Sequence, residues 1–277
     1  MPELPEVETI KNTVKQVLQN ATLVDVVVRQ RKFREEVPVD FADKIKGAKV
    51  VNLRRIAKYL LIDLNNGYTL IWHFGMSGKF KIADEIPKNP DKHDHIILVT
   101  DQGVVTYNDT RRFGLVTYCE SAKLGQHHLL AKLGLDPWDE KLTPDYLLQK
   151  FKKKKTPIKL ALLDQEIICG IGNIYASEIL YKARIRPDRP SESVTCAEAT
   201  EIITFTRQIL EQSIKAGGST IHDFKRPDGD IGYFQNQLCV YGKEGKRCPD
   251  CVCGGKEPIK KSVMGGRSTF FCTTLQK

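Results

Sequence analysis

The chain has 277 residues, of which 41% are hydrophobic and 28% charged, a composition typical of a globular protein. No apolar run reaches the roughly 18 residues of a membrane-spanning helix, and the acidic opening MPELPEVETI lacks the apolar core of a signal peptide. We therefore expect a cytoplasmic protein without a membrane segment, and the formal net charge of +9 favours a polyanionic partner.

An amphipathic helix is predicted over residues 7–18. Its apolar side chains recur with helical spacing at Val7, Ile10, Val14, Val17 and Leu18. This spacing would give the helix one buried face near the start of the chain.

Short β-like runs follow between residues 22 and 118. They are Leu23–Arg29, Tyr59–Leu64, Thr69–Trp72, Ile96–Thr100, Val104–Tyr107 and Leu115–Tyr118. The turn sequences at 65–67 and 101–103 separate two pairs of these runs as hairpins. Several short strands at this spacing predict an antiparallel sandwich or barrel.

The second half of the chain has helical patterns. We expect helices over 143–152, 157–166, 174–182 and 195–215, a loop over 217–236, and a cysteine-bearing β module from 238 with Cys239 in a strand. The predicted class is α+β. Its parts are a β-sandwich with a leading helix (1–124), a linker (125–142), a helical domain (143–237) and a small finger-like hairpin module (238–277).

The first residues could carry chemistry of their own. Initiator Met is normally removed before proline, so Pro2 would present a secondary amine whose pKa is about 7.7–8.0. Attack of this amine on C1′ of a deoxyribose gives an iminium ion that acidifies the C2′ hydrogen, and strand cleavage by elimination follows. Glu3 and Glu6 could move the protons. The alternative is that MPEL only caps a helix.

Two glycine-bearing turns are candidates for contact with a base stack. In HFGMSG (73–78), Met76 lies on a tight turn, where an apolar side chain could fill the hole left by a flipped nucleotide. In DTRRFG (109–114), adjacent arginines and Phe113 could supply phosphate or base-edge contacts and a stacking wedge. The alternatives are a Met packed in the core and a solvated basic turn.

Two later segments could bind phosphate. The four consecutive lysines at 152–155 could neutralise a nucleic-acid backbone or could simply be a solvated helix end. GIGNIYASE (170–178) places a Gly-rich turn before a helix, so Asn173 and nearby amides could hold a phosphate. A plain helix–turn–helix is the alternative.

Cysteines cluster near the C-terminus. They are Cys248, Cys251, Cys253 and Cys272, and the first two have the Cys-x₂-Cys spacing of a tetrahedral zinc site. In a reducing compartment this clustering favours a metal over disulfides. Arg267 is expected at the tip of the module, where it would meet a phosphate.

Taken in order, these motifs resemble the formamidopyrimidine-DNA glycosylases over nearly the whole chain. The matching segments are MPELPEVET, AKYL (57–60), HFGMSG, KHDH (92–95), RRFG, GIGNIYASE, VYG and GRSTFFC. The resemblance implies a helix–two-turn–helix element, a C-terminal zinc finger with one Zn²⁺ per chain, and a monomer. It implies base-excision repair of damaged double-stranded DNA, with removal of oxidised purines such as 8-oxoguanine and formamidopyrimidines and strand cleavage by β,δ-elimination.

The resemblance also implies a role for each site residue. Pro2 would be the Schiff-base nucleophile, Glu3 the acid/base, Glu6 its support, and Lys58 a phosphate contact that aids β-elimination. The implied DNA contacts are Met76, Arg111 and Phe113 at the void and the opposite base, and His93, Lys155 and Asn173 elsewhere; Arg267 would grip a phosphate and take part in δ-elimination. The implied zinc ligands are Cys248, Cys251, Cys253 and Cys272, although Leu275 stands where the family has its last cysteine.

Two other functions remain open at this point. A sister branch of enzymes acts on oxidised pyrimidines, but it typically opens with Gly in place of Leu4. A damaged-DNA-binding protein without catalysis is the other alternative, and the presence of Pro2, Glu3 and Lys58 argues against it.

Overall fold

The computed structural model describes residues 2–220, 226–250 and 257–277. The chain divides into two compact units. The first comprises Met1–Ala131 and Ile214–Gln235, and the second comprises Lys132–Ser213 and Asn236–Lys277. No helix in the described ranges is long and apolar enough to cross a membrane.

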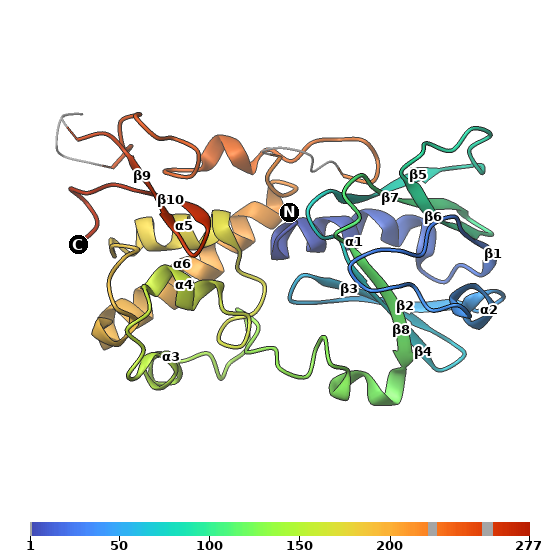
Figure 1. Cartoon of the computed structure of the whole chain (residues 1–277), viewed down its shortest axis with the longest axis horizontal. Helices are drawn as coiled ribbons and strands as arrows, with labels where there is room; N and C mark the ends of the chain where they lie inside the picture. Colours follow the sequence, from blue (N-terminus) through green and yellow to red (C-terminus); the bar gives the residue numbers. More distant parts are fainter. Residues whose placement is uncertain (1, 221–225, 251–256) are drawn as a thin grey trace. The chain divides into compact units, whose positions relative to one another are not determined.

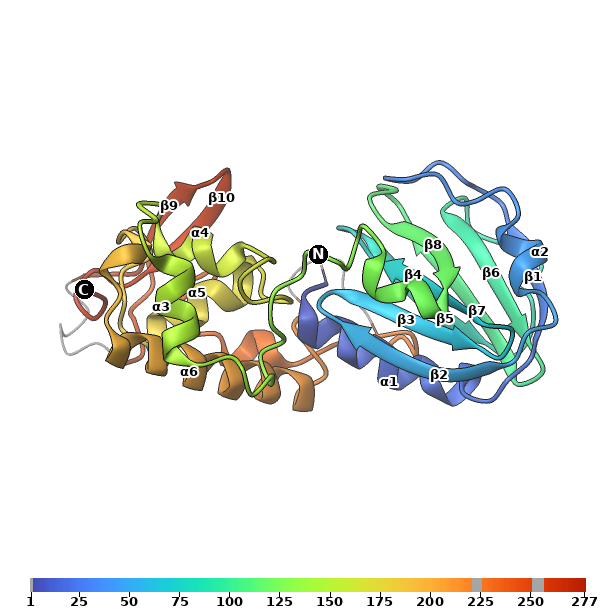
Figure 2. The same ribbon diagram turned by 90° about the horizontal axis from the view of Figure 1, so that it is seen from below.

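The first unit is a β-sandwich with a leading helix, as the sequence predicts. Its elements are α1 (Leu4–Leu18), β1 (Leu23–Val28), α2 (Phe41–Ile45), β2 (Val50–Ile56), β3 (Tyr59–Leu64), β4 (Tyr68–His73), β5 (Gly78–Ala83), β6 (Asp94–Thr100), β7 (Gly103–Asp109), β8 (Leu115–Glu120) and the 3₁₀ turn η1 (Ser121–Gln126). Two four-stranded antiparallel sheets result, in the orders β1-β6-β7-β5 and β2-β3-β4-β8 (Figure 2).

The sandwich core is aromatic at its centre. Trp72 is fully buried, and its ring lies edge-on to Phe80 at 5.0 Å and to Tyr107 at 5.2 Å between centroids. The apolar face of α1 contacts β2 and β3 of one sheet and β5 and β7 of the other (Figure 1). The helix therefore closes the sandwich along one side, which fixes where the start of α1 lies within this unit.

The sequence analysis missed two strands of the sandwich. Both β2 and β5 are edge strands, and their burial patterns follow no strict alternation. An edge strand pairs on one side only, so it tolerates the polar residues that hide a period of two. The hairpin turns are confirmed. Gly67 has a positive φ between β3 and β4, and Gly103 has a positive φ at the start of β7.

The second unit contains the predicted helices and a C-terminal hairpin. Its elements are α3 (Pro144–Phe151), α4 (Ile158–Leu163), α5 (Asn173–Lys182), η2 (Ser191–Ser193), α6 (Cys196–Lys215, whose last residues belong to the first unit), η3 (Phe234–Gln237, likewise shared), β9 (Lys260–Met264) and β10 (Arg267–Phe271). The expected strand at Cys239 is wrong. This residue lies in a bend, because its backbone N–H donates a hydrogen bond to the buried carboxylate of Glu178 at 2.7 Å and not to a neighbouring strand.

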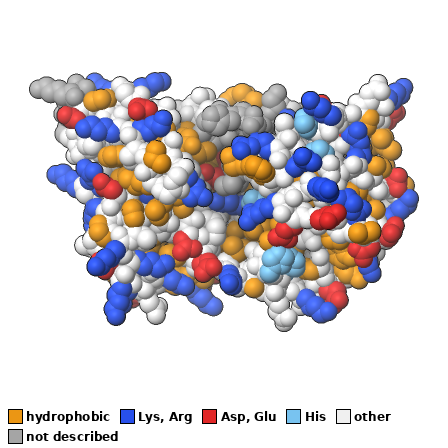
Figure 3. Space-filling model, in the orientation of Figure 1, with side chains coloured by type: hydrophobic (Ala, Val, Ile, Leu, Met, Phe, Trp, Pro, Cys, Tyr) orange, Lys and Arg blue, Asp and Glu red, His pale blue; other side chains and the backbone are white. Residues whose placement is uncertain are grey.

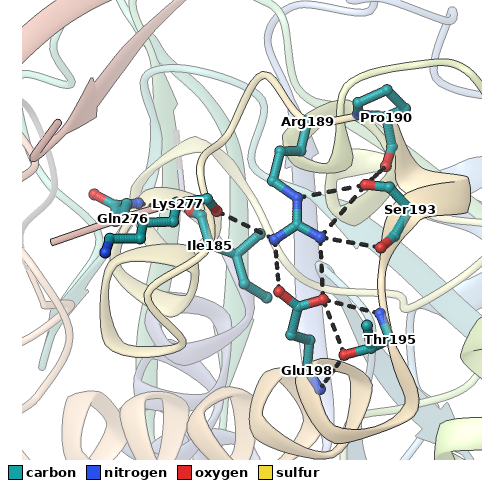
Figure 4. A network of polar contacts seen from close by, with 8 residues as sticks. All are labelled: Ile185, Arg189, Pro190, Ser193, Thr195, Glu198, Gln276 and Lys277. Carbon is teal, nitrogen blue, oxygen red and sulfur yellow. Dashed lines mark hydrogen bonds and ion pairs between the residues drawn. The ribbon is translucent and has the colours of Figure 1, made fainter. Parts of the chain in front are cut away.

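The end of the chain is tied into the helical region by Arg189 (Figure 4). Its guanidinium donates to both carboxylate oxygens of Glu198 near the start of α6 and to the carbonyl of Lys277 at 3.1 Å. Glu198 also accepts the backbone N–H of Thr195 at 2.9 Å. One side chain thus joins the start of α6 to the C-terminal residue.

Candidate functional site

The N-terminus of α1 is held by a pair of buried carboxylates. Glu3 is the N-cap, and its side chain accepts the backbone N–H of Glu6, while Glu6 Oε2 accepts the backbone N–H of Glu3 at 2.9 Å. Glu6 Oε1 accepts the backbone N–H of Ser219 at 2.8 Å. Backbone donors on both oxygens suit an anchoring carboxylate more than one that shuttles protons. The predicted helix cap is therefore real, and it places Pro2 in a buried position directly before it.

Lys58 lies in the turn between β2 and β3, and it is 8% exposed. The preceding Ala57 has φ +51, and its carbonyl accepts the guanidinium of Arg55 at 3.1 Å. Arg55 also bonds Glu8 of α1 at 3.0 Å. The helix that follows Pro2 and the turn that presents Lys58 are thus joined through two side chains within the first unit.

Met76 and Phe113 stand on neighbouring turns and are not core residues. They are 41% and 49% exposed, so the core-packing alternative for Met76 is wrong. The guanidinium carbon of Arg111 lies 4.7 Å from the centroid of the Phe113 ring. Met76 and Phe113 border a cavity of about 440 Å³, whose other lining residues are Phe33, Arg34, His73, Gly75 and Arg112. Exposed apolar side chains beside arginines are the combination that the sequence predicts for these turns.

His73 forms one wall of this cavity. Burial, followed by the positive charges of Lys58 and Arg34, lowers its pKa to about 4. Its Nδ1 accepts the backbone N–H of Gly75 at 3.1 Å, which leaves Nε2 to carry the proton of the neutral ring. His93, a predicted DNA contact, lies half-buried in the turn before β6 with its ring edge-on to that of His95.

In the second unit, Asn173 is the first residue of α5 and is bound to the C-terminal hairpin. Its Nδ2 donates to the carbonyl of Ser268 at 3.0 Å, and its Oδ1 accepts Lys159 Nζ at 2.7 Å. Arg267, the residue before Ser268, is exposed at the start of β10. The structure therefore brings the elements that carry Asn173 and Arg267 together, whereas Lys155 lies exposed in the segment between α3 and α4.

Lys159 is a residue that the sequence analysis missed. It is fully buried, and besides Asn173 its ammonium donates to the carbonyl of Ser268 at 3.0 Å and to Thr269 Oγ1 at 2.7 Å. Because a buried ammonium needs such acceptors, Lys159 locks the start of α5 to β10. The signal was a single lysine inside the apolar stretch IKLALL.

Two of the four predicted zinc ligands lie in the described residues. Cys248 and Cys272 are fully buried in one cluster, and Cys248 Sγ lies 3.0 Å from the hydroxyl of Tyr181. Cys251 and Cys253 fall outside the described residues. Where the structure describes the chain, no three His, Cys, Asp or Glu residues gather as a metal site. The two buried thiols lie in one cluster, and sulfur is a donor that zinc prefers.

Leu275 occupies the place of the missing cysteine, and it packs half-buried against this cluster. The next residue, Gln276, is 1% exposed. It accepts the backbone N–H of Cys272 at 2.8 Å and donates to the carbonyl of Ile185 at 2.9 Å. Packing and hydrogen bonds thus hold the chain end beside the two thiols.

Basic side chains are widespread on the surface. Figure 3 shows Lys and Arg over much of the face in view, with Asp and Glu between them. The excess of positive charge is consistent with a polyanionic partner.

Comparison with known proteins identifies the family. The model of the formamidopyrimidine-DNA glycosylase N-terminal domain matches residues 1–116, and that of the H2TH domain matches residues 133–225. The formamidopyrimidine-DNA glycosylases of Jannaschia sp. (strain CCS1) and Rhodospirillum rubrum are 40% and 42% identical, each over all of both chains. The chain belongs to the formamidopyrimidine-DNA glycosylase family.

Solved structures agree with this assignment. MutM (Fpg) from Thermus thermophilus has a TM-score of 0.87 and 34% identity, covering 99% of this chain and 98% of that one. Lactococcus lactis Fpg in complex with abasic-site DNA has a TM-score of 0.90 and 29% identity, covering 99% of each chain. The expected α+β fold is confirmed.

We predict that Lys159→Met lowers the free energy of unfolding by at least about 2 kcal/mol, because it leaves buried acceptors unsatisfied. Urea denaturation measures the change. Lys155→Met, at an exposed position nearby in sequence, is the control and should stay within about 0.5 kcal/mol of the wild type. Equal stability of the two variants would contradict the locking role of Lys159.

We also predict a pH dependence from His73. Its folded pKa of about 4 lies below the ordinary value of 6.5, so only the unfolded chain binds the proton between these values. Stability contributed by the neutral ring is therefore lost as pH falls, by about 2 kcal/mol from pH 7 to pH 5. Urea denaturation at both pH values should show a smaller loss for His73→Gln. The exposed-site change His128→Gln serves as control, and an unchanged loss in His73→Gln would contradict the assignment.

Proposed function

We propose that this chain excises oxidised purines from damaged double-stranded DNA and then cuts the strand, with the α-amine of Pro2 as nucleophile. The buried capping pair of Glu3 and Glu6 is the observation that carries the proposal, because it holds the start of the chain in one place. The family's activity and the DNA complexes of the Lactococcus lactis relative support it.

The chemistry follows from a secondary amine. Once Met1 is removed, the nitrogen lone pair of Pro2 forms a bond to C1′, the glycosidic bond breaks, and the base leaves with a proton. Opening of the sugar gives an iminium ion, with Glu3 supplying a proton to the ring oxygen. Loss of the C2′ proton expels the 3′ phosphate, and a second elimination expels the 5′ phosphate. In this proposal Lys58 holds a phosphate and assists the first proton transfer, and Glu6 acts as an anchor.

Access to C1′ requires the damaged nucleotide to leave the stack. We propose that Met76 fills the space left by the flipped nucleotide and that Arg111 and Phe113 contact the base opposite the lesion. All three side chains are exposed on adjoining turns. His93, Lys155, Asn173 and Arg267 are proposed to bind the DNA backbone, and Arg267 also to assist δ-elimination. The chain would act as a monomer on the nucleoid in the cytoplasm, where such DNA lies.

A zinc ion is proposed for the C-terminal module. Cys248 and Cys272 would supply two thiolates, and Cys251 and Cys253 the other two. Bound zinc would stabilise the module that presents Arg267 and would take no part in the reaction.

The nucleophile is tested by borohydride trapping on a duplex with one 8-oxoguanine opposite cytosine. Wild-type protein should form a covalent adduct whose DNA maps to the N-terminal peptide. Pro2→Gly, which replaces a fixed secondary amine by a flexible primary amine, should trap roughly 100-fold less while retaining most of its DNA affinity. Pro90→Gly, in a surface loop, is the control.

Each other outcome has a definite meaning. Full trapping by Pro2→Gly would refute the assignment of the nucleophile. An adduct only at an oxidised pyrimidine would move the chain to the sister activity. No adduct at any lesion or abasic site would favour a protein that only binds DNA.

The metal is tested by elemental analysis of purified protein, which should give about one zinc per chain. Removal by a chelator should lower the melting temperature and weaken DNA binding. Folded protein that cleaves DNA without zinc would refute this site. The hydrogen bonds of Gln276 would then hold the end of the chain in place of the metal.

A further inference from the structure

Two turns of the first unit touch backbone against backbone. One joins β4 to β5 and carries Met76, and the other joins β7 to β8 and carries Arg111 and Phe113. A Cβ on Gly75, in the first turn, would lie 2.3 Å from the carbonyl atoms of Phe113 in the second. A Cβ on Gly114 would lie 1.8 Å from the hydroxyl of Tyr107. Neither position has room for a side chain, so the turns pack directly together.

A buried carboxylate lies beneath this contact. Asp109 is fully buried, and its Oδ1 accepts the hydroxyl of Ser77 from the Met76 turn at 2.6 Å. Its Oδ2 accepts the backbone N–H of Gly114, at the end of the other turn, at 2.8 Å and the hydroxyl of Tyr107 at 3.2 Å. One carboxylate therefore bonds both turns and Tyr107 of β7.

Ser77 extends the connection to Arg111. The backbone N–H of Arg111 donates to Ser77 Oγ at 2.9 Å and to Asp109 Oδ1 at 3.3 Å. Ser77 is 8% exposed, so water does not readily replace these bonds. The backbone of Arg111 is thus fixed by a hydroxyl that belongs to the turn of Met76.

The donors around Asp109 keep their protons. Burial and the carboxylate of Asp109 hold the pKa of Tyr107 well above its ordinary value, so its hydroxyl remains a donor. His95, whose pKa is lowered by burial, bonds the carbonyl of Asp109 through Nε2 at 2.9 Å. A carbonyl oxygen can only accept, so Nε2 of His95 carries the proton of this hydrogen bond.

We infer that Asp109 is a positioning residue. It holds the two turns together as one rigid unit that recognises the base opposite the lesion. It fixes the distance between the side chain that fills the void and the side chains that probe the remaining base. The inference rests on the proposed function, since it concerns the same DNA-contacting turns. Its consequence is that opposite-base preference depends on a carboxylate that itself contacts no DNA.

The variant Asp109→Asn tests the positioning role of Asp109, because the side chain keeps almost the same volume. The amide nitrogen is a donor. At the Oδ2 position it would face the backbone N–H of Gly114, and at the Oδ1 position it would face the backbone N–H of Arg111 and force the Ser77 hydroxyl to turn around. Excision of 8-oxoguanine opposite cytosine should fall roughly 10- to 100-fold, and the ratio of excision opposite cytosine to that opposite adenine should approach one. Borohydride trapping on a single-stranded abasic oligonucleotide needs neither void filling nor an opposite base, so it should remain near the wild-type level.

Two further variants separate positioning from a general loss of stability. Ser77→Ala removes only the hydroxyl between the turns and should show a smaller change in the same ratios. Asp63→Asn alters another hydrogen-bonded carboxylate of the sandwich, which binds Arg54 and Thr69. This control should keep the wild-type opposite-base ratio even if it melts at a lower temperature.

Amide hydrogen exchange gives a readout that does not depend on catalysis. In Asp109→Asn, the peptides that contain Ser77 and Arg111 should both exchange at least about tenfold faster than in the wild type. Unchanged exchange in the Met76 turn, or an unchanged opposite-base ratio in active Asp109→Asn, would overturn the inference. Absence of trapping by the wild type would count against the proposed function alone, and the exchange result would still decide the coupling.

Discussion

The constraint on which the rest depends is the burial of Glu6 at the first turn of α1. A carboxylate leaves water without a large penalty only when its oxygens accept hydrogen bonds. Here the donors are the backbone N–H groups of Glu3 and Ser219, which come from opposite ends of the first unit's sequence. Satisfying the hydrogen-bonding capacity of one side chain therefore fixes the start of the helix, the adjoining Pro2, and the segment that follows α6. The apolar face of α1, packed on both sheets, makes that position part of the fold.

The same solution recurs at three other buried ionisable groups, Lys159, Asp109 and Glu178. Lys159 joins α5 to the hairpin, and Asp109 joins two turns. Glu178 accepts the backbone N–H groups of three consecutive residues from Cys239 onward. Burial raises the pKa of Glu178, and the three backbone donors partly offset that rise. Lys159 and Asp109 thereby hold segments that carry proposed DNA contacts, Asn173 beside β10 in one case and the turns of Met76 and Arg111 in the other.

Local patterns predicted the elements with a strong period. The helices appeared as apolar stripes, and the hairpins as Asn-Gly and Gln-Gly turns between alternating runs. The edge strands β2 and β5 were missed because in the described residues each pairs with another strand on one side only, so polar residues interrupt the alternation. Lys159 was missed because a single lysine in an apolar helix is more often a solvated residue. Cys239 was assigned wrongly, because the contact that bends it comes from Glu178, which lies far from it in sequence.

The sequence by itself determined the class of fold, the family and the candidate chemistry. Periodicity and short motifs are local properties, so they can be recognised without the three-dimensional structure. Only the tertiary structure decided that Glu6 is bound by backbone donors, that Met76 is exposed, and that Asp109 bonds two turns at once. These facts depend on which distant donors reach a buried acceptor. That pairing is set by the packing of the whole unit and produces no periodic pattern in the sequence.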